Sequence, residues 1–359
     1  MSADIKVLIV DDSALIRKIL SEIINTAQGM EVVGTASDPH IARDKIKKLS
    51  PDVLTLDIEM PKMDGISFLK KIMSLRPMPV IMISTLTEKG AQVTMDALSI
   101  GAFDFIPKPR MDEQSKLLHY QQEIVEKIRA AAASNIARID RGQRKKASQT
   151  ATGEMAGYTP SSGYMLAIGA STGGTEAIKD VLMGMPANCP PIVIAQHIPE
   201  SFSTSFARRL NSCCPIHVHE AINGENILPG HAYLAPGSEH LYVKKKGAGF
   251  VCQLSAGELV NRHRPSVDVL FESVAKACGN QVSAALLTGM GADGAKGLLK
   301  IKQAGGYTVV QDQATSVVWG MPGVAVSMQA HQEELPLLKV ASGLLKHSGK
   351  FRAVKTGSK

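Results

Sequence analysis

The sequence predicts an α/β protein with two doubly wound, mostly parallel-sheet domains joined by a flexible linker. Short apolar runs alternate with helical patterns along most of the chain, which is typical of parallel sheets covered by helices. The alternation stops once, in a segment without aliphatic periodicity. The 359 residues, 44% of them hydrophobic, also exceed the roughly 250–300 residues at which a single core stops growing. We expect domains at 1–130 and 164–359 and a linker at 131–163.

Five β/α units are predicted in the first domain. The run KVLIV at 6–10 is a short buried strand, and the residues after it repeat at helical spacing: Leu15, Ile16, Ile19, Leu20, Ile23 and Ile24. Four further runs are predicted strands with helices between them: MEVVGTAS at 30–37, PDVLTLD at 51–57, PVIMIS at 79–84 and AFDFI at 102–106. These units predict a parallel, doubly wound sheet that ends near residue 130.

The linker precedes a second α/β pattern. From residue 147 the chain reads ASQTATGEMAGYTPSSG, whose Ser, Thr, Gly and Ala content is typical of a flexible linker. The predicted strands that follow are YMLAIGA at 164–170, PPIVIAQ at 190–196, PIHVHEA at 215–221, a hairpin HLYVKKKGAGFVCQL at 240–254, VSAALLT at 282–288 and YTVVQ at 307–311. Helices follow several of them, so the second domain is also predicted to be α/β.

Composition and charge disfavour several classes of protein. The net charge of +7 is spread thinly along the chain, so we expect no nucleic-acid partner. The N-terminus lacks the basic region of a signal peptide, and no stretch approaches the roughly 18 apolar residues of a membrane span. Five irregularly spaced cysteines predict no disulfide framework. We expect a cytoplasmic protein without direct membrane insertion.

Polar residues end several strands of the first domain. Asp11 and Asp12 follow the first strand, and Asp57 and Glu59 follow the third. A doubly wound sheet brings these acids together at its carboxyl edge, and crowded carboxylates with oxygen-only ligands suit Mg²⁺. The alternative is that such acids only cap helices, as Asp12 or Ser13 could do. The combination of acids with a hydroxyl and a lysine at later strand ends favours metal and phosphoryl chemistry.

This pattern resembles the receiver domain of two-component response regulators over residues 4–125. The resemblance implies a flavodoxin-like fold in which Asp57 is phosphorylated. Mg²⁺ would then be held by Asp11, Asp12, Asp57 and the backbone carbonyl of Glu59. Ser84 and Lys108 would contact the phosphoryl group. Phe105 would occupy the position of an aromatic switch residue, without the hydroxyl of the tyrosine that is common there.

The stretch IGASTGGTEAI at 168–178 is a glycine-rich turn between a strand and a helix, which could bind a phosphate or present a nucleophile. A dinucleotide fingerprint needs a middle glycine where this chain has Ser171, and an acid at the end of the next strand where it has Gln196 and His197. Both departures disfavour a cofactor site. The stretch instead satisfies G-x-S-x-G, which exposes a serine hydroxyl at a sharp turn.

A serine nucleophile needs a base, and His197 ends the adjacent predicted strand. The alternative is that Ser171 only caps a helix and His197 only bonds to backbone. For the acid that orients the histidine we prefer Asp293, which follows a strand through a glycine-dense turn at the same sheet edge. Asp312 is the second choice, and Asp268 lies inside a predicted helix. The backbone N–H groups of Thr172 and Met290 are candidate oxyanion donors.

Four segments, GASTGGTEAI, AQHIP, HRPSVDVLF and LTGMGADGAKGL, resemble the catalytic domain of the CheB family, the protein-glutamate methylesterases of bacterial chemotaxis. The resemblance implies a Rossmann-like hydrolase domain whose triad is Ser171, His197 and Asp293, with Thr172 and Met290 at the oxyanion positions. It also implies a phosphorylation-activated enzyme that demethylates glutamate methyl esters on chemoreceptors and deamidates particular glutamines, without a cofactor for hydrolysis. Its partners would be methyl-accepting chemoreceptors and a chemotaxis histidine kinase, with recruitment from the cytoplasm to receptor arrays.

Some polar residues are left without an assigned role. Cys213, Cys214, His217 and His219 lie close in sequence, but adjacent cysteines rarely suit one tetrahedral zinc site. Arg262 and Arg264 could contact substrate or linker, or could simply be solvated. We also expect the unphosphorylated receiver to restrain the catalytic domain by packing near the carboxyl edge of its sheet.

Overall fold

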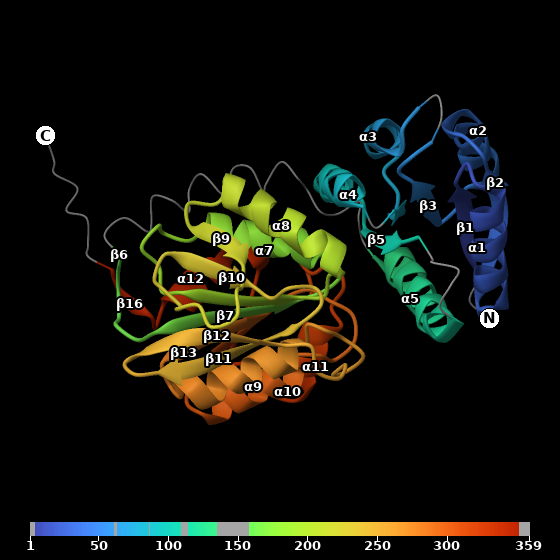
Figure 1. Cartoon of the computed structure of the whole chain (residues 1–359). Coiled ribbons are helices and arrows are strands. Elements are labelled where there is room, and N and C mark those ends of the chain that lie inside the picture. Colours follow the sequence, from blue (N-terminus) through green and yellow to red (C-terminus); the bar gives the residue numbers. More distant parts are fainter. Residues whose placement is uncertain (1–3, 61–62, 86, 109–113, 135–157, 352–359) are drawn as a thin grey trace, which may run out of the picture. The chain divides into compact units, whose positions relative to one another are not determined.

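A computed structural model describes residues 4–60, 63–85, 87–108, 114–134 and 158–351 of the chain. The chain forms two compact units, Met1–Ile139 and Asp140–Lys359. Each unit contains its own parallel sheet with helices packed against it (Figure 1). The predicted α/β fold class is confirmed.

The first unit has a five-stranded parallel sheet in the order β2-β1-β3-β4-β5. Its elements are β1 (Ile5–Val10), α1 (Ala14–Thr26), β2 (Met30–Ala36), α2 (Pro39–Leu49), β3 (Val53–Asp57), α3 (Gly65–Leu75), β4 (Val80–Ser84), α4 (Glu88–Ile100), β5 (Asp104–Pro107) and α5 (Gln114–Ala133). Every residue of β3 and β4 is buried, so both faces of the central sheet are covered. The five strands predicted for this unit are all present.

Loop side chains begin the helices of this unit. The Ser13 hydroxyl accepts a hydrogen bond from the Ile16 N–H at the start of α1, and Asp38 accepts from two N–H groups at the start of α2. Of the two residues that could cap α1, Ser13 is therefore the cap. Asp12 remains free for another role at the sheet edge.

The second unit has a seven-stranded parallel sheet in the order β15-β14-β13-β7-β8-β10-β9. Two further pairs, β11–β12 and β6–β16, form separate two-stranded sheets. The strands of the unit are β6 (Tyr158–Pro160), β7 (Met165–Ala170), β8 (Ile192–Gln196), β9 (His217–Glu220), β10 (His231–Leu234), β11 (His240–Lys246), β12 (Gly249–Ser255), β13 (Val282–Leu286), β14 (Tyr307–Gln311), β15 (Glu333–Leu335) and β16 (Gly349–Phe351). Its helices are α7 (Gly174–Met183), α8 (Glu200–Cys213), α9 (Val267–Cys278), α10 (Ala295–Gln303), α11 (Met321–Ser327) and α12 (Leu337–Leu345).

The helices form two layers around this sheet. Helix α7 packs on α8 and α12, whereas α10 packs on α9 and α11, and Figure 1 shows these two groups on opposite faces. The predicted hairpin is present as the antiparallel pair β11–β12, and β11 packs on α9. Strand β7 lies at the centre of the sheet and is entirely buried, which is why its sequence is apolar without alternation.

The predicted linker at 131–163 overlaps a described element at each end. Helix α5 continues to Ala133 because it packs on α1. Strand β6 already belongs to the second unit, because it pairs with β16. Residues 135–157 lie outside the described part of the chain. Among the described residues, no helix is long and apolar enough to cross a membrane.

Helix α9 approaches the sheet closely at its first residue. A Cβ added at Gly169, on β7, would lie 2.1 Å from Cγ1 of Val267, and one added at Gly294 would lie 2.6 Å from the same atom. Both positions therefore require the absence of a side chain. This close approach brings the N-terminus of α9 to the carboxyl edge of the sheet.

We predict that Gly169→Ala destabilises the second unit by about 1–3 kcal/mol, because the new methyl group must displace the buried Val267 side chain. Urea unfolding followed by the fluorescence of Trp319, the chain's one tryptophan, measures this unit specifically. Gly249→Ala is the matched control, because its nearest neighbour would be 4.0 Å away and the residue is exposed. Equal stability of the two variants would contradict the role given to Gly169.

Candidate active site

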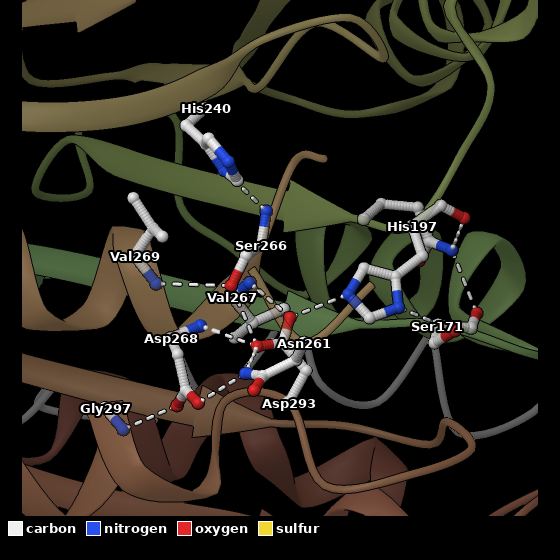
Figure 2. Close-up of polar contacts among 11 residues, drawn as sticks. Ser171, His197, His240, Asn261, Ser266, Val267, Asp268, Val269, Asp293 and Gly297 are labelled. Carbon is white, nitrogen blue, oxygen red and sulfur yellow. Dashed lines mark hydrogen bonds and ion pairs between the residues drawn. The ribbon is translucent and has the colours of Figure 1, made fainter. Parts of the chain in front are cut away.

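Ser171 and His197 follow β7 and β8, which are adjacent parallel strands, and the two side chains meet at the sheet edge (Figure 2). His197 Nδ1 lies 3.1 Å from Ser171 Oγ, and His197 Nε2 lies 2.8 Å from Asp293 Oδ2. For Nδ1 to accept the serine proton, Nε2 must carry the ring hydrogen and donate it to Asp293. The three side chains form a continuous chain from hydroxyl to imidazole to carboxylate.

The turn after β7 holds Ser171 in place. The Ser171 N–H donates to the carbonyl of Thr288, and the Gly174 N–H donates to the carbonyl of Ser171. Gly173 between them has φ +74°, a left-handed conformation that glycine adopts without strain. The Gln196 side-chain amide donates to the carbonyls of both Ser171 and His197, at 2.9 and 3.0 Å. Sequence reasoning used Gln196 only as evidence against a nucleotide site and missed this bracing role.

The Asp293 carboxylate lies against the N-terminus of α9, where the first backbone N–H groups have no acceptor within the helix. Its Oδ2 accepts from the Val267 N–H at 2.6 Å as well as from His197. Its Oδ1 accepts from the Ser266 hydroxyl at 2.8 Å, the Asn261 amide at 2.6 Å and the Asp268 N–H at 3.2 Å. Figure 2 shows these donors converging on one carboxylate, which is only 2% exposed.

The ionisation of Asp293 follows from these contacts. Burial raises its pKa, but the hydrogen bond from His197 and the charge on that ring lower it, and the bonds from Asn261 and Val267 lower it further. The net effect places the pKa of Asp293 well below its ordinary value. The carboxylate is therefore ionised at neutral pH and faces the imidazole.

The carboxylates of the other two candidate acids bond to groups other than His197. Asp312 accepts from the N–H and hydroxyl of Thr315 in its own loop. Asp268 is in α9, as predicted, but its carboxylate is buried beside Asp293 and accepts from the Gly297 N–H at 2.6 Å. The structure thus brings Asp293 to His197 and places Asp268 behind it.

The two oxyanion candidates flank the serine. Thr172 follows Ser171 directly and is buried. Met290 follows Gly289, whose backbone packs against the nucleophile: a Cβ added at Gly289 would lie 2.7 Å from Ser171 Cβ. Glycine at 289 thus permits the loop after β13 to approach Ser171.

The residues without an assigned role form local contacts of their own. The Cys213 and Cys214 thiols lie 3.9 Å apart, His219 contacts Glu225 at 3.0 Å, and His217 stacks on His231. Within the described ranges, three metal-ligating side chains converge at the aspartates of the first unit and not at this set. Arg264 donates to the carbonyls of Ala256 and Gly257, which assigns it a role inside its own loop.

The acids of the first unit converge as predicted. Ligand atoms of Asp11, Asp12 and Asp57 lie within 4.8 Å of one another. Lys108 Nζ lies 2.9 Å from Asp57 Oδ2 and 3.5 Å from Asp11 Oδ2. Burial raises the pKa of Asp57 to about 6, and the charge of Asp11 adds to the rise although Lys108 opposes it. The N–H of Glu59 lies 3.4 Å from Asp57 Oδ1.

Ser84 and Phe105 have partners outside this acid cluster. The Ser84 hydroxyl accepts a hydrogen bond from Thr94 on α4 at 2.8 Å and lies 3.4 Å from the carbonyl of Gly90. Phe105 is buried, and the Lys127 ammonium lies over its ring and bonds to its carbonyl. Because Ser84 is the acceptor in the bond from Thr94, its own O–H can still donate to a group on Asp57.

The comparisons with known proteins cover both units. A family model described as CheB methylesterase matches residues 166–344, and one described as response regulator receiver domain matches residues 7–119. A relative from Albidiferax ferrireducens, named protein-glutamate methylesterase/protein-glutamine glutaminase 1, is 53% identical over 348 residues, which cover 95% of this chain and 93% of that protein. A similarly named relative from Saccharophagus degradans is 52% identical over 345 residues, covering 96% and 99%.

One solved structure supports the fold of the second unit. The crystal structure of the Thermotoga maritima CheB methylesterase catalytic domain is 37% identical to this chain, with a TM-score of 0.51. The match covers 52% of this chain and 99% of that one.

We predict that Asp293→Asn lowers the stability of the second unit at neutral pH by about 1–3 kcal/mol, because a charged acceptor of several buried donors is lost. The folded-state pKa of Asp293 is depressed, so its stabilisation is present above the ordinary value of 3.8 and is lost as pH falls below it. The gap between the urea midpoints of wild type and variant, read by Trp319 fluorescence, should therefore stay constant from about pH 7 to about pH 5 and begin to narrow as pH falls from about 4 to about 3. Asp312→Asn, which keeps an acceptor for Thr315, is the control; a pH-independent gap for Asp293→Asn would refute this prediction.

Proposed function

Because the chain belongs to the CheB methylesterase family and carries a receiver domain ahead of its catalytic domain, we propose that it is a phosphorylation-regulated serine hydrolase of chemotaxis. Its substrates are the methyl esters of glutamate side chains on chemoreceptors, and the names of its relatives extend this to glutamine amides. The observation that carries the proposal is the hydrogen-bonded series of Ser171, His197 and Asp293 at the ends of adjacent strands.

The acylation step follows from these distances. Ser171 Oγ bonds to the ester carbonyl carbon while its proton passes to His197 Nδ1, 3.1 Å away. The imidazolium that forms keeps its Nε2–H on the ionised Asp293, which stabilises the positive charge. Collapse of the tetrahedral intermediate breaks the bond to the methoxy oxygen, which takes the proton from Nδ1 and leaves as methanol.

Deacylation repeats the same transfers with water. Water gives a proton to His197 Nδ1 and bonds to the acyl carbon. The proton then passes to Ser171 Oγ as the bond to the acyl carbon breaks, and the glutamate leaves as the carboxylic acid, which loses its own proton to solvent. With a glutamine side chain the first leaving group is ammonia, and the second half of the reaction is unchanged. One site thus accounts for both activities in the relatives' names.

The negative oxygen of each intermediate needs donors beside Ser171. We assign this role to the backbone N–H groups of Thr172 and Met290. Their support is positional: Thr172 is the next residue in the turn, and Met290 follows the glycine that packs against the serine. A side chain at Gly289 would force this loop away from the nucleophile.

In the receiver, we assign Asp57 as the phosphoryl acceptor and a chemotaxis histidine kinase as the donor. Mg²⁺ would be held by Asp11, Asp12, Asp57 and the Glu59 backbone carbonyl. The donor set fits this ion, because its side-chain ligands are oxygens and Asp11 Oδ2 is buried without a hydrogen-bond partner in the described part of the chain. When bound, the ion offsets the carboxylate repulsion that Lys108 offsets only in part.

Phosphorylation would change the contacts of the receiver locally. A phosphoryl group on Asp57 adds oxygens that the Lys108 ammonium and the Ser84 hydroxyl can bind. Because the Ser84 hydroxyl also accepts a hydrogen bond from Thr94, its movement toward the phosphoryl group would change a contact with α4. This would couple phosphorylation to the position of α4 through a buried contact. The chemoreceptor substrates imply that the enzyme acts at receptor arrays.

We predict that Ser171→Ala and His197→Ala each lower esterase activity by at least about 10³-fold, and that the double variant loses little more, because both belong to one catalytic unit. The assay is methanol release from methylated receptor membranes in the presence of a phosphodonor. Ser327→Ala, an exposed serine at the end of α11, should keep wild-type activity. Additive losses, or activity retained by Ser171→Ala, would refute the proposed nucleophile.

Mg²⁺ binding at the receiver aspartates can be measured directly. Calorimetric titration with MgCl₂ should show binding to the wild-type chain that Asp11→Asn weakens at least about tenfold, because one ligand charge is removed. Binding should also weaken from pH 8 to pH 5.5, because the pKa of Asp57 near 6 means that protons then compete with the ion. Asp96→Asn, exposed on α4, controls for net charge. Equal binding by both variants would place the metal elsewhere.

A further inference from the structure

A tight turn at Val260–His263, which the reaction described above does not use, lies against the active site. Two backbone hydrogen bonds close it, from the Val260 N–H to the His263 carbonyl at 3.1 Å and from the His263 N–H to the Val260 carbonyl at 2.9 Å. Its central residues Asn261 and Arg262 have φ of 51° and 68°, and asparagine is one of the few non-glycine residues that favour this left-handed region. The turn therefore holds the residues at its positions in fixed directions.

The Asn261 side chain lies between two buried carboxylates. Its Nδ2 donates to Asp293 Oδ1 at 2.6 Å and to Asp268 Oδ2 at 2.8 Å (Figure 2). The two acids are 2% and 4% exposed, so their charges repel each other in a region with little water. An amide nitrogen carries two donor hydrogens and no charge, which matches one acceptor on each side.

His263, at the end of the same turn, covers the other member of the pair. Its ring stacks on His197 with centroids 3.6 Å apart and planes inclined by 14°. A parallel ring at this distance blocks rotation of the His197 imidazole out of its plane. One short turn thus contacts both the base and the acid.

We propose that the Val260–His263 turn is a positioning clamp for the His197–Asp293 pair. Asn261 fixes Oδ1 of Asp293 and keeps Asp268 from repelling it, so that Oδ2 stays directed at His197 Nε2. His263 keeps the His197 ring in the plane that joins Ser171 to Asp293. Both are positioning residues, because neither has a place in the bond changes of the reaction. The inference rests on the proposed function, since it assumes that this pair activates Ser171.

The first test removes the Asn261 amide without straining the turn. Asn261→Gly retains the left-handed backbone, and we expect kcat for methanol release from methylated receptor membranes to fall about 10²-fold, with KM changed less than about twofold. The isosteric Asn261→Asp should fall at least as far, because a third carboxylate replaces the donor. Gln329→Gly is the matched control: it also replaces a left-handed residue by glycine, at an exposed site after α11, and should keep wild-type kcat.

A spectroscopic readout separates positioning from loss of fold. In the wild-type full chain labelled with ¹⁵N-histidine, the His197 Nε2–H that donates to Asp293 should give a low-field proton resonance, absent in His197→Ala. Asn261→Gly and Asn261→Asp should broaden or shift it while Trp319 fluorescence remains that of the folded chain. Wild-type kcat together with an unchanged resonance in either variant overturns the clamp. Retained activity in Ser171→Ala would instead overturn the proposed function, which keeps the two failures distinct.

The second test concerns the stacked ring. His263→Ala should lower kcat about tenfold or more without raising KM, whereas His263→Phe, which restores a flat ring over His197, should recover most of the loss. If His263→Phe is as slow as His263→Ala, stacking is not what His263 contributes, and its part in the clamp is refuted. If both variants keep wild-type kcat, the same conclusion follows.

Discussion

The carboxylate of Asp293 at the N-terminus of α9 is the interaction on which the rest of the active site depends. It accepts hydrogen bonds from five donors, two of them backbone N–H groups at the start of the helix. Bonds to a charged acceptor are each worth about 1.5–3 kcal/mol, and the helix N-terminus adds a favourable field. Because the carboxylate is saturated with donors, it cannot rotate away from His197. The fold thus fixes the acid before a substrate arrives.

That interaction in turn requires close packing between α9 and the sheet. Gly169 and Gly294 let Val267 lie directly on the edge from which Ser171 and His197 emerge. If the helix stood a methyl group further away, the N–H of Val267 could not reach Asp293 while Asp293 reached His197. The glycines around these turns therefore allow the helix to pack closely, in addition to permitting the turns themselves. The site is formed where three parts of the fold pack together: the edge of the sheet, α9 and the loop before α10.

The part of the active site that lies at the ends of parallel strands could be predicted from the sequence, and the part in the loops could not. Ser171, His197 and Asp293 could be placed together because neighbouring parallel strands end side by side, and the acids of the receiver could be placed together for the same reason. Asn261 and Ser266 could not, because their segment has no periodicity and its turn relies on left-handed residues. The helical pattern around Asp268 disfavours it as the acid, yet its place in the first turn of α9 puts it beside the site. The Ser84–Thr94 bond joins a strand end to a helix face, which no local pattern specifies.

The orientation of the His197 ring has a consequence for chemical labelling. In the serine proteases of the chymotrypsin type the imidazole faces the serine with Nε2 and the acid with Nδ1, whereas here the two nitrogens are exchanged. Nδ1 adjoins the ring carbon that carries the side chain, so the basic nitrogen stays near its own main chain while the far nitrogen spans the gap to Asp293. An affinity reagent that is captured by Ser171 and then alkylates the neighbouring base would therefore leave the π-substituted regioisomer of histidine. In chymotrypsin-type enzymes, where Nε2 is the base, the same reagent would give the τ-substituted isomer. The two isomers have the same mass but differ in fragmentation and in chromatographic retention.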